Sequence, residues 1–303
     1  MEISAKLVKE LRDRTNAGIL DCKKALSETK GNIEEAIKWL RETGITKAAK
    51  KAGRIAAEGL IGIKSNKNEL VICEINSETD FVSKNADMLK LVEDITTILL
   101  NNNFKNVDEA LNEKFKGKVN QEGKTIKEIL SYNISIIGEN ISLRRFEKIE
   151  NVNKGILTSY LHSDSSVGTI ISFDNNVDET IARQIAMHIT AMKPAFISKS
   201  DLSAEYVEKE RSMIENELLN DAANAKKPKE ILAKIIEGRL SKELSQNTLL
   251  EQPFVVDPSV KVGELLKRQK ANIIKAVTFT VGEGIEKEEV SFADEVKAAQ
   301  LAK

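Results

Sequence analysis

The side chains that most often carry out catalysis are scarce in this sequence. His162 and His188 are its two histidines, and Cys22 and Cys73 are its two cysteines. A histidine-based catalytic triad or a His/Cys metal site needs several such side chains close together. The sequence has too few histidines and cysteines for either kind of site. The glycines at 282–284 complete neither a P-loop nor a dinucleotide-binding fingerprint. We therefore expect no catalytic residues, no bound metal and no cofactor, and a protein that is not an enzyme.

A different kind of chemistry is available to the segment Ser77–Val82. It directly follows Leu70–Ile75, a β-branched stretch that predicts a buried strand. If the backbone is still extended there, Asp80 and Phe81 point in opposite directions. The ring could then fill an apolar pocket of a partner, and the carboxylate could compete for a cation or a backbone N–H. The residues leave one alternative open, in which Asp80 caps the next helix and Phe81 is its first core residue.

Length and composition limit the classes of protein to be considered. The chain has 303 residues with 41% hydrophobic residues, which suggests about two or three domains with apolar cores. Its net charge of -1 argues against a whole-protein field that attracts nucleic acid, so such a contact would be local. The start at Met1–Lys6 has no signal pattern, and no apolar run of about 18 residues follows. We expect a soluble, cytoplasmic protein with no membrane contact.

The spacing of apolar residues predicts a helical head. Its three short helices lie around Leu7–Leu11, over Asp21–Thr29 and from Asn32 onward, and Gly44 is expected to end the third. The following run, Lys47–Arg54, is basic and rich in alanine. Such a run could contact phosphate or an acidic surface, or it could be a solvated linker helix.

Strands and a helical insertion are predicted after the head. The strands lie at Leu60–Lys64, Glu69–Ile75, Ile141–Ile149, Ile156–Leu161, Val167–Phe173 and Ala276–Val281. The first two flank Ser65–Asn68, whose turn-forming residues predict a hairpin. The last strand comes about a hundred residues after the one before it, so its sheet must contain an insertion. Helices are predicted there at Glu179–Met192, Ser203–Ala225 and Lys229–Leu244, the last two as an antiparallel hairpin, and a closing helix at Phe292–Ala302. The fold class is therefore α+β.

Many short motifs in a fixed order resemble those of one protein family, bacterial elongation factor Ts. They are Leu7–Arg12, Thr15, Gly18, Asp21–Leu26, Lys47–Gly53, Thr79–Val82, Ile137–Ile141, Arg144 with Arg145, Ala186–Ile189, Lys193 with Pro194, Gln252–Val255 and Val281–Lys287. The resemblance covers nearly the whole chain. It implies a ubiquitin-associated-like three-helix bundle, a core of two α+β subdomains with antiparallel sheets, a helical coiled-coil insertion and a C-terminal helical module.

The predicted division of the chain follows that architecture. The head and its basic linker take residues 1–54, and the first core subdomain takes 55–140. The second core subdomain takes 141–178 and 245–281, on either side of the insertion at 179–244. The C-terminal module takes 282–303.

The resemblance also implies a function, which is guanine-nucleotide exchange on elongation factor Tu in its GDP-bound and nucleotide-free forms. In that family the segment corresponding to Thr79, Asp80, Phe81 and Val82 dislodges Mg²⁺ from the partner's nucleotide site, which favours the contact role for Asp80 and Phe81. Further partner contacts are implied for Gly18, Ile19, Leu20 and Asp21 in the head, and for His162. No direct nucleic-acid contact is expected, and a homodimer or 2:2 complex through the coiled coil is left open. The alternative is an RNA- or ribosome-binding scaffold protein that uses Lys47–Arg54.

Overall fold

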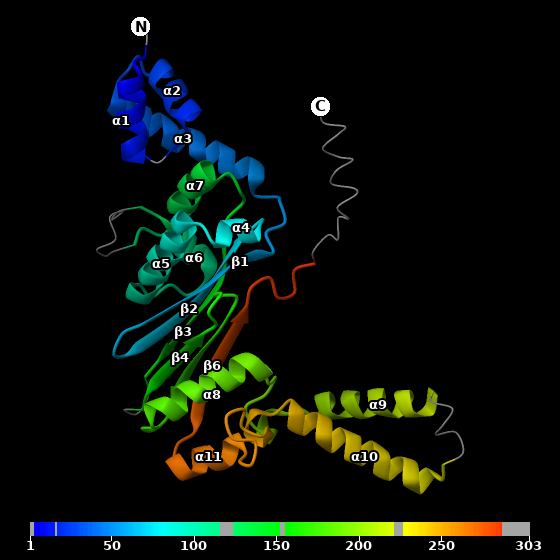
Figure 1. Ribbon diagram of the computed structural model, residues 1–303. Coiled ribbons are helices and arrows are strands. Elements are labelled where there is room, and N and C mark those ends of the chain that lie inside the picture. The colour runs from blue at the N-terminus through cyan, green and yellow to red at the C-terminus, as the bar shows by residue number, and fades with distance from the viewer. Residues whose placement is uncertain (1–2, 16, 116–123, 152–154, 221–226, 287–303) are drawn as a thin grey trace. The chain divides into compact units, whose positions relative to one another are not determined.

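The computed structural model describes residues 3–15, 17–115, 124–151, 155–220 and 227–286. Of these, one compact unit holds the residues within Met1–Gly62, Cys73–Phe146 and Thr280–Lys303, and the other those within Ile63–Ile72 and Glu147–Phe279. The helices and strands (Figure 1) are α1 (Ala5–Thr15), α2 (Ile19–Glu28), α3 (Ile33–Lys51), β1 (Glu58–Ser65), β2 (Glu69–Ser77), α4 (Asp80–Ser83), α5 (Ala86–Asn101), α6 (Val107–Asn112), α7 (Ile126–Ile137), β3 (Ser142–Glu150), β4 (Leu157–Leu161), β5 (Val167–Phe173), α8 (Glu179–Met192), α9 (Ala204–Asn220), α10 (Lys229–Gln246), α11 (Val262–Gln269) and β6 (Ile273–Thr280).

The three predicted helices of the head are present as α1, α2 and α3. Asn32 begins α3 as predicted, because its side-chain oxygen accepts the backbone N–H groups of Glu34 and Glu35. The helices enclose a small apolar core made of Leu11, Ala17, Cys22, Ala25, Leu26, Ala36 and Leu40.

The prediction that Gly44 ends the third helix is wrong, because α3 continues to Lys51. A Cβ atom at residue 44 would lie 3.2 Å from the Cβ and Oγ of Ser135 in α7. The glycine therefore lets two helices approach closely instead of stopping one. The residues after it, rich in lysine and alanine, are good helix formers that carry the helix onward.

Six strands form two sheets in the described residues, in the orders β1-β2-β3 and β4-β5-β6. The predicted hairpin of β1 and β2 is confirmed. Its turn is held by Asn66, whose side-chain oxygen accepts the backbone N–H groups of Asn68 and Glu69 at 2.8 Å. Strands β4 and β5 are antiparallel, with Leu157 opposite Ser172. The mixture of helices with antiparallel sheets confirms the α+β class.

Strand β3 lies beside β2, although the sequence grouped it with the strands that follow it. Because β3 is the next strand of the chain after β2, this pairing follows the preference for sequential neighbours, and a buried charge on β2 stabilises it. Glu74 of β2 is fully buried and accepts hydrogen bonds from Arg144 at 2.9 Å and Arg145 at 2.6 Å, both on β3. The adjacent arginines therefore attach β3 to β2.

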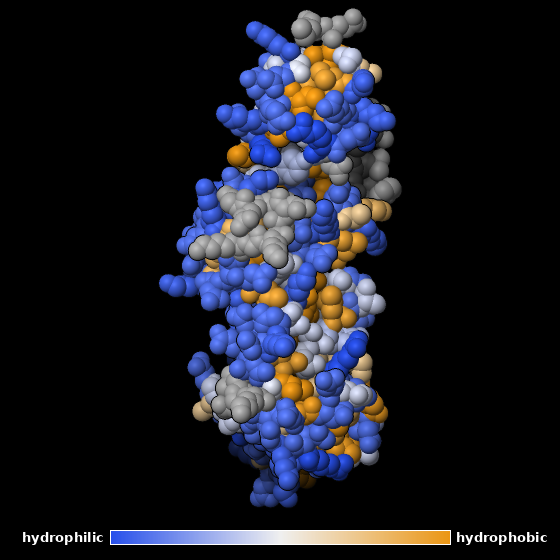
Figure 2. Space-filling view, turned by 90° about the vertical axis from the view of Figure 1, so that its left-hand side faces the viewer, coloured by the Kyte–Doolittle hydropathy of each residue, from blue (hydrophilic) through white to orange (hydrophobic). Residues whose placement is uncertain are grey.

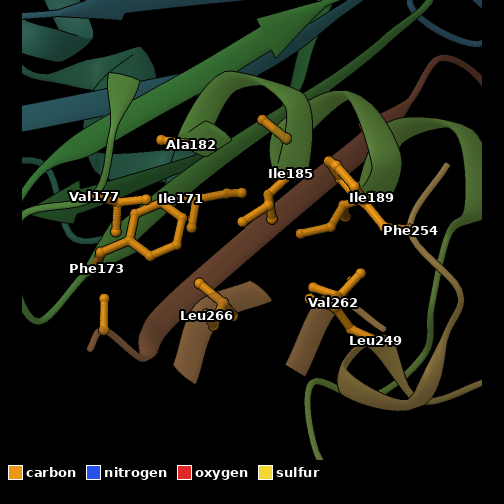
Figure 3. Packing of buried hydrophobic residues seen from close by; sticks show 12 residues of the cluster. Ile171, Phe173, Val177, Ala182, Ile185, Ile189, Leu249, Phe254, Val262 and Leu266 are labelled. Atoms are coloured by element: carbon orange, nitrogen blue, oxygen red, sulfur yellow. The ribbon is translucent and has the colours of Figure 1, made fainter. Parts of the chain in front are cut away.

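The second unit has an apolar core between β5, α8 and α11. Figure 3 shows Ile171 and Phe173 of β5 gathered with Ile185 of α8 and Leu266 of α11. His188 of α8 is fully buried next to this core, where its Nε2 lies 2.8 Å from the side-chain oxygen of Gln252.

The predicted helical hairpin is formed by α9 and α10. Ile214 and Leu218 of α9 pack against Leu240 of α10, and Arg211 pairs with Glu237 across the hairpin. The closing helix predicted at Phe292–Ala302 lies outside the described residues. Within the described residues, no helix combines the length and the apolar character that spanning a membrane requires.

Candidate functional site

The segment that the sequence analysis singled out forms a very short helix, α4, directly after β2. Phe81 on this helix is 80% exposed, whereas its neighbour Val82 is buried. The alternative that made Phe81 a core residue is therefore wrong, and Val82 takes that place. Thr79, not Asp80, is the residue that precedes the helix. The Asp80 carboxylate lies 3.1 Å from Nζ of Lys84, one turn further along the chain.

The residue before α4 is held from outside the segment by Glu139, in the loop after α7. One oxygen of this carboxylate accepts the Thr79 backbone N–H at 2.9 Å, and the other accepts the Thr79 hydroxyl at 2.6 Å. Next to it, the Asn140 backbone N–H donates to Glu78 at 2.6 Å. The Asn140 amide donates to the Arg54 carbonyl at 2.8 Å. These contacts fix the backbone on which Asp80 and Phe81 stand.

Sequence reasoning missed the roles of Glu139 and Asn140, although both lie in a quoted motif. They are about sixty residues from Thr79, so no local pattern connects them. The available signal was Gly138, whose φ of 90° ends α7 in the left-handed region that favours glycine. Such a cap turns the chain sharply, and the polar residues after it can then reach a neighbouring element.

The basic run at the end of α3 is largely used within the unit. Lys47 pairs with Asp21 at 2.8 Å, and Arg54 pairs with Glu78 at 3.3 Å. Lys51 donates a hydrogen bond to the carbonyl of Gly138. The run therefore supports the head and the Glu139 loop, and these charges are partly neutralised by their own chain.

The four head residues of the predicted contact surround the start of α2. Gly18 is the N-cap of α2, and Asp21 in its first turn holds Lys47. Ile19 is 55% exposed and Leu20 is 82% exposed, so these two present apolar surface. A groove of the head near Ile19 has apolar and charged walls made of Ile3, Ala5, Val8, Lys9, Arg12, Asp13, Ile19 and Lys23. Figure 2 shows hydrophobic residues on the surface of the head among hydrophilic ones.

His162 lies in the second unit, just after β4. Its Nδ1 is 2.8 Å from Oδ1 of Asp164. The same oxygen accepts the backbone N–H and the hydroxyl of Ser166. The Ser166 hydrogen bonds, with a smaller contribution from His162, lower the pKa of Asp164 to about 2. The exposed imidazole is thus oriented by a charged carboxylate, and its Nε2 edge faces away from that bond.

The arrangement around α4 suits contact with another molecule, because an exposed aromatic ring and a neighbouring carboxylate stand on a rigid support. Among the described residues, no group of three His, Cys, Asp or Glu side chains comes together in a way that could hold a metal ion. The two cysteines are buried, and burial raises the pKa of the Cys73 thiol to about 11. A thiol with such a pKa is protonated at neutral pH and is a poor nucleophile.

Two comparisons with known proteins identify the same protein family. The family model described as Elongation factor TS matches residues 78–283, a range that begins next to Thr79 and includes Glu139 and His162. Elongation factor Ts of Spiroplasma citri is 47% identical over 301 residues, which cover 99% of this chain and 100% of the relative. Both matches agree with the resemblance carried by the motifs. The chain belongs to the elongation factor Ts family of translation elongation factors.

Proposed function

We propose that this protein is the guanine-nucleotide exchange factor of elongation factor Tu, acting in the cytoplasm during translation elongation. It binds the GDP-bound partner, speeds the release of GDP and leaves a nucleotide-free complex that GTP can enter. Membership of the family supports this role. By linkage, the factor and the nucleotide weaken each other's binding to the partner by the same factor.

The proposed mechanism is the displacement of Mg²⁺ from the partner's nucleotide site by Thr79, Asp80, Phe81 and Val82. In such GTPases Mg²⁺ bridges phosphate oxygens and neutralises part of their charge. The Phe81 ring inserts between helices of the partner's nucleotide domain, and the Asp80 carboxylate disturbs the groups that surround the cation. Without the cation the phosphate charge is less well compensated, and GDP leaves faster. The factor itself supplies no acid, base or nucleophile.

One observation carries this proposal most directly, the exposure of Phe81 on a helix with a fixed backbone. A free phenylalanine side chain at the surface is costly to keep in water and contributes large apolar area when it enters a pocket. The support from Glu139 reduces the ordering cost of that insertion, since the helix is already held. An exposed ring on a rigid base is the arrangement that an anchor residue of an interface needs.

Two further contacts complete the proposed interface. In the head, Ile19 and Leu20 offer apolar surface, with Gly18 and Asp21 shaping the start of α2. In the second unit, the oriented imidazole of His162 offers a hydrogen-bonding group. These contacts supply affinity, whereas the Asp80–Phe81 pair acts on the nucleotide site.

The proposal is tested by stopped-flow release of a fluorescent GDP from elongation factor Tu. The wild-type protein should accelerate release strongly, and Phe81→Ala and Asp80→Ala should each reduce the acceleration. Met192→Ala is a matched control, because Met192 is 50% exposed at the end of α8, away from the proposed contacts in the sequence. If wild-type protein leaves the release rate unchanged, the exchange function is wrong. If it accelerates release but the two variants do so equally well, the Mg²⁺-displacement mechanism is wrong.

The alternative, an RNA- or ribosome-binding scaffold, is weakened by the contacts of the basic run. Lys47, Lys51 and Arg54 each have a partner in their own chain. Neutralised cations contribute less to the counterion release that drives RNA binding. The alternative predicts RNA affinity that falls steeply with salt, which a filter-binding titration of the free protein measures.

A homodimer or a 2:2 complex with the partner through the α9–α10 hairpin remains a proposal. Met213 and Leu219 of α9 and Ile231 of α10 are large apolar residues that are about half exposed or more. Their exposure supports a second surface packing on the hairpin. Light scattering of the free protein and of the complex gives the stoichiometry.

A further inference from the structure

We propose that Glu139 is a positioning residue that orients Asp80 and Phe81, and that it acts on the Mg²⁺-displacing step instead of on affinity for the partner. This inference rests on the exchange function proposed above. Glu139 lies outside the Thr79–Val82 segment but sets the orientation of that segment.

Helix α4 has little stability of its own. It contains four residues, and a helix of that length forms only marginally in water. In the described chain the Thr79 side chain does not cap it, since the hydroxyl instead donates to Glu139. The orientation of the helix must therefore come from contacts with the rest of the unit.

Two such contacts lie at its start and its middle. Glu139 holds both the backbone and the side chain of Thr79, where the chain leaves β2. Val82 is buried and attaches the helix to the core. Successive residues of a helix are rotated by about 100°. With Thr79 and Val82 both held, the rotation of α4 about its axis is set, and Phe81 is turned outward.

Glu139 is itself firmly placed by its neighbours. Gly138 takes a positive φ and receives a hydrogen bond from Lys51 at the end of α3. Asn140 is joined to Glu78 through its backbone N–H and to the Arg54 carbonyl through its amide. The loop is thus fixed on both sides of Glu139, so its carboxylate works as a rigid support for Thr79.

The substitution Glu139→Gln tests this role. An amide keeps the size of the side chain but loses the charge, and its NH2 group must donate to the Thr79 hydroxyl instead of accepting from it. Two charge-assisted hydrogen bonds therefore become weaker neutral ones. A loss of about 1.4 kcal/mol of hydrogen bonding corresponds to tenfold in rate. We expect the maximal rate of GDP release at saturating factor to fall roughly tenfold, while the concentration for half-saturation stays unchanged.

A chelator separates positioning from a general structural defect. Release of labelled GDP from elongation factor Tu is measured with Mg²⁺ present and with excess EDTA. Once the metal has been removed, there is no cation left to displace, so Glu139→Gln should match the wild type in EDTA. A defect that persists in EDTA, or a raised half-saturation concentration, would show an effect on folding or affinity and would overturn the inference. So would an unchanged rate in Mg²⁺.

Two further variants sharpen the result. Glu147→Gln is the matched control, because it makes the same chemical change at an exposed carboxylate that pairs with Lys275 at 2.9 Å. It should leave the rates at the wild-type value. In the Asp80→Ala/Phe81→Ala background, adding Glu139→Gln should cost nothing further, since neither of the side chains that it orients is left; additive losses would contradict the inference. If the wild-type protein itself does not accelerate release, the exchange function fails, which is a different result from any outcome for Glu139.

Discussion

Phe81 and Val82 are consecutive residues of helix α4, yet Phe81 is 80% exposed and Val82 is 8% exposed. Val82 packs the helix against the core of its unit. The Phe81 ring lies mostly in solvent and contributes little to the packing of the folded chain. A large ring kept in water in this way is the strongest structural argument for an interaction at this position.

The two substitutions Phe81→Ala and Val82→Ala should therefore differ in their effect on the free energy of unfolding. Phe81→Ala should change the free energy of unfolding by less than about 0.5 kcal/mol, as for other surface changes, while GDP release is slowed. Val82→Ala should destabilise the fold by about 1–2 kcal/mol, because it removes buried methyl groups. Urea unfolding monitored by circular dichroism measures both. A clear loss of stability in Phe81→Ala would mean that its ring packs within the fold.

Gly44 provides a second test, of the approach between α3 and α7. A Cβ at this residue would lie 3.2 Å from Ser135, so Gly44→Val should force the two helices apart and cost about 1–3 kcal/mol. The matched control is Gly238→Ala in α10, where an added Cβ meets nothing within 4 Å among the described residues. That change should stabilise the protein by about 0.5–1 kcal/mol. Equal effects of the two substitutions on thermal unfolding would contradict the close approach.

Patterns within one segment predicted most of the helices and strands. Helix α8 and strand β5 have the predicted bounds, because their periodicity and flanking residues are local features of the sequence. Asn66 and its neighbours predicted the β1–β2 hairpin for the same reason. In contrast, a glycine in a helical pattern signals either an end or a close contact. The meaning of Gly44 therefore depended on Ser135, which is distant in the sequence.

The candidate site was predicted only in part. The sequence identified Asp80 and Phe81 as unusual and left open whether the ring was buried. The structure resolves this through the burial of Val82, which no periodicity could show in a helix of four residues. The contact of Glu139 with Thr79 and the pairing of Glu74 with Arg144 are long-range, and one sequence alone contains no signal for such pairs.

His188 should remain neutral at pH values where a free histidine is protonated. It is fully buried, and burial lowers its pKa. The backbone N–H of Val255 donates to Nδ1 at 3.1 Å, so Nδ1 is unprotonated and Nε2 carries the proton that faces Gln252 at 2.8 Å. Because the folded pKa is below the unfolded value of about 6.5, this contribution to stability is complete above that pH and falls as the pH drops below it.

NMR can follow the protonation of His188 directly, because the spectrum contains the ring signals of two histidines, His162 and His188. The ring protons of His188 should titrate below pH 6.5, if they titrate before the protein unfolds. His188→Phe assigns the signal and removes the Nδ1 acceptor from the Val255 N–H, which should lower stability. A His188 signal that titrates at or above the value of a free histidine would contradict the buried neutral ring.

Glu74 should make the first unit sensitive to acid. Burial alone would raise the pKa of this carboxyl, but the Gly282 N–H and the guanidinium groups of Arg144 and Arg145 outweigh it and hold the pKa below its ordinary value. Since the folded pKa lies below the unfolded value of about 4.3, the stabilisation is complete above that pH and is lost as the pH falls through the folded pKa.

The substitution Glu74→Gln tests this. It leaves Arg144 and Arg145 without their shared carboxylate and should cost about 3 kcal/mol at pH 7, the lower end for a broken buried pair, because both arginines are partly exposed. The gap between variant and wild type, measured by urea unfolding, should shrink as the pH falls below the unfolded value of about 4.3 and through the lowered folded pKa of Glu74, because the wild-type carboxyl then becomes protonated. A gap that stays constant over that range would mean that Glu74 contributes through packing and not through its charge. The same substitution should also loosen the attachment of β3 to β2, which hydrogen exchange of the Arg144 and Arg145 amides would report as faster exchange at pH 7.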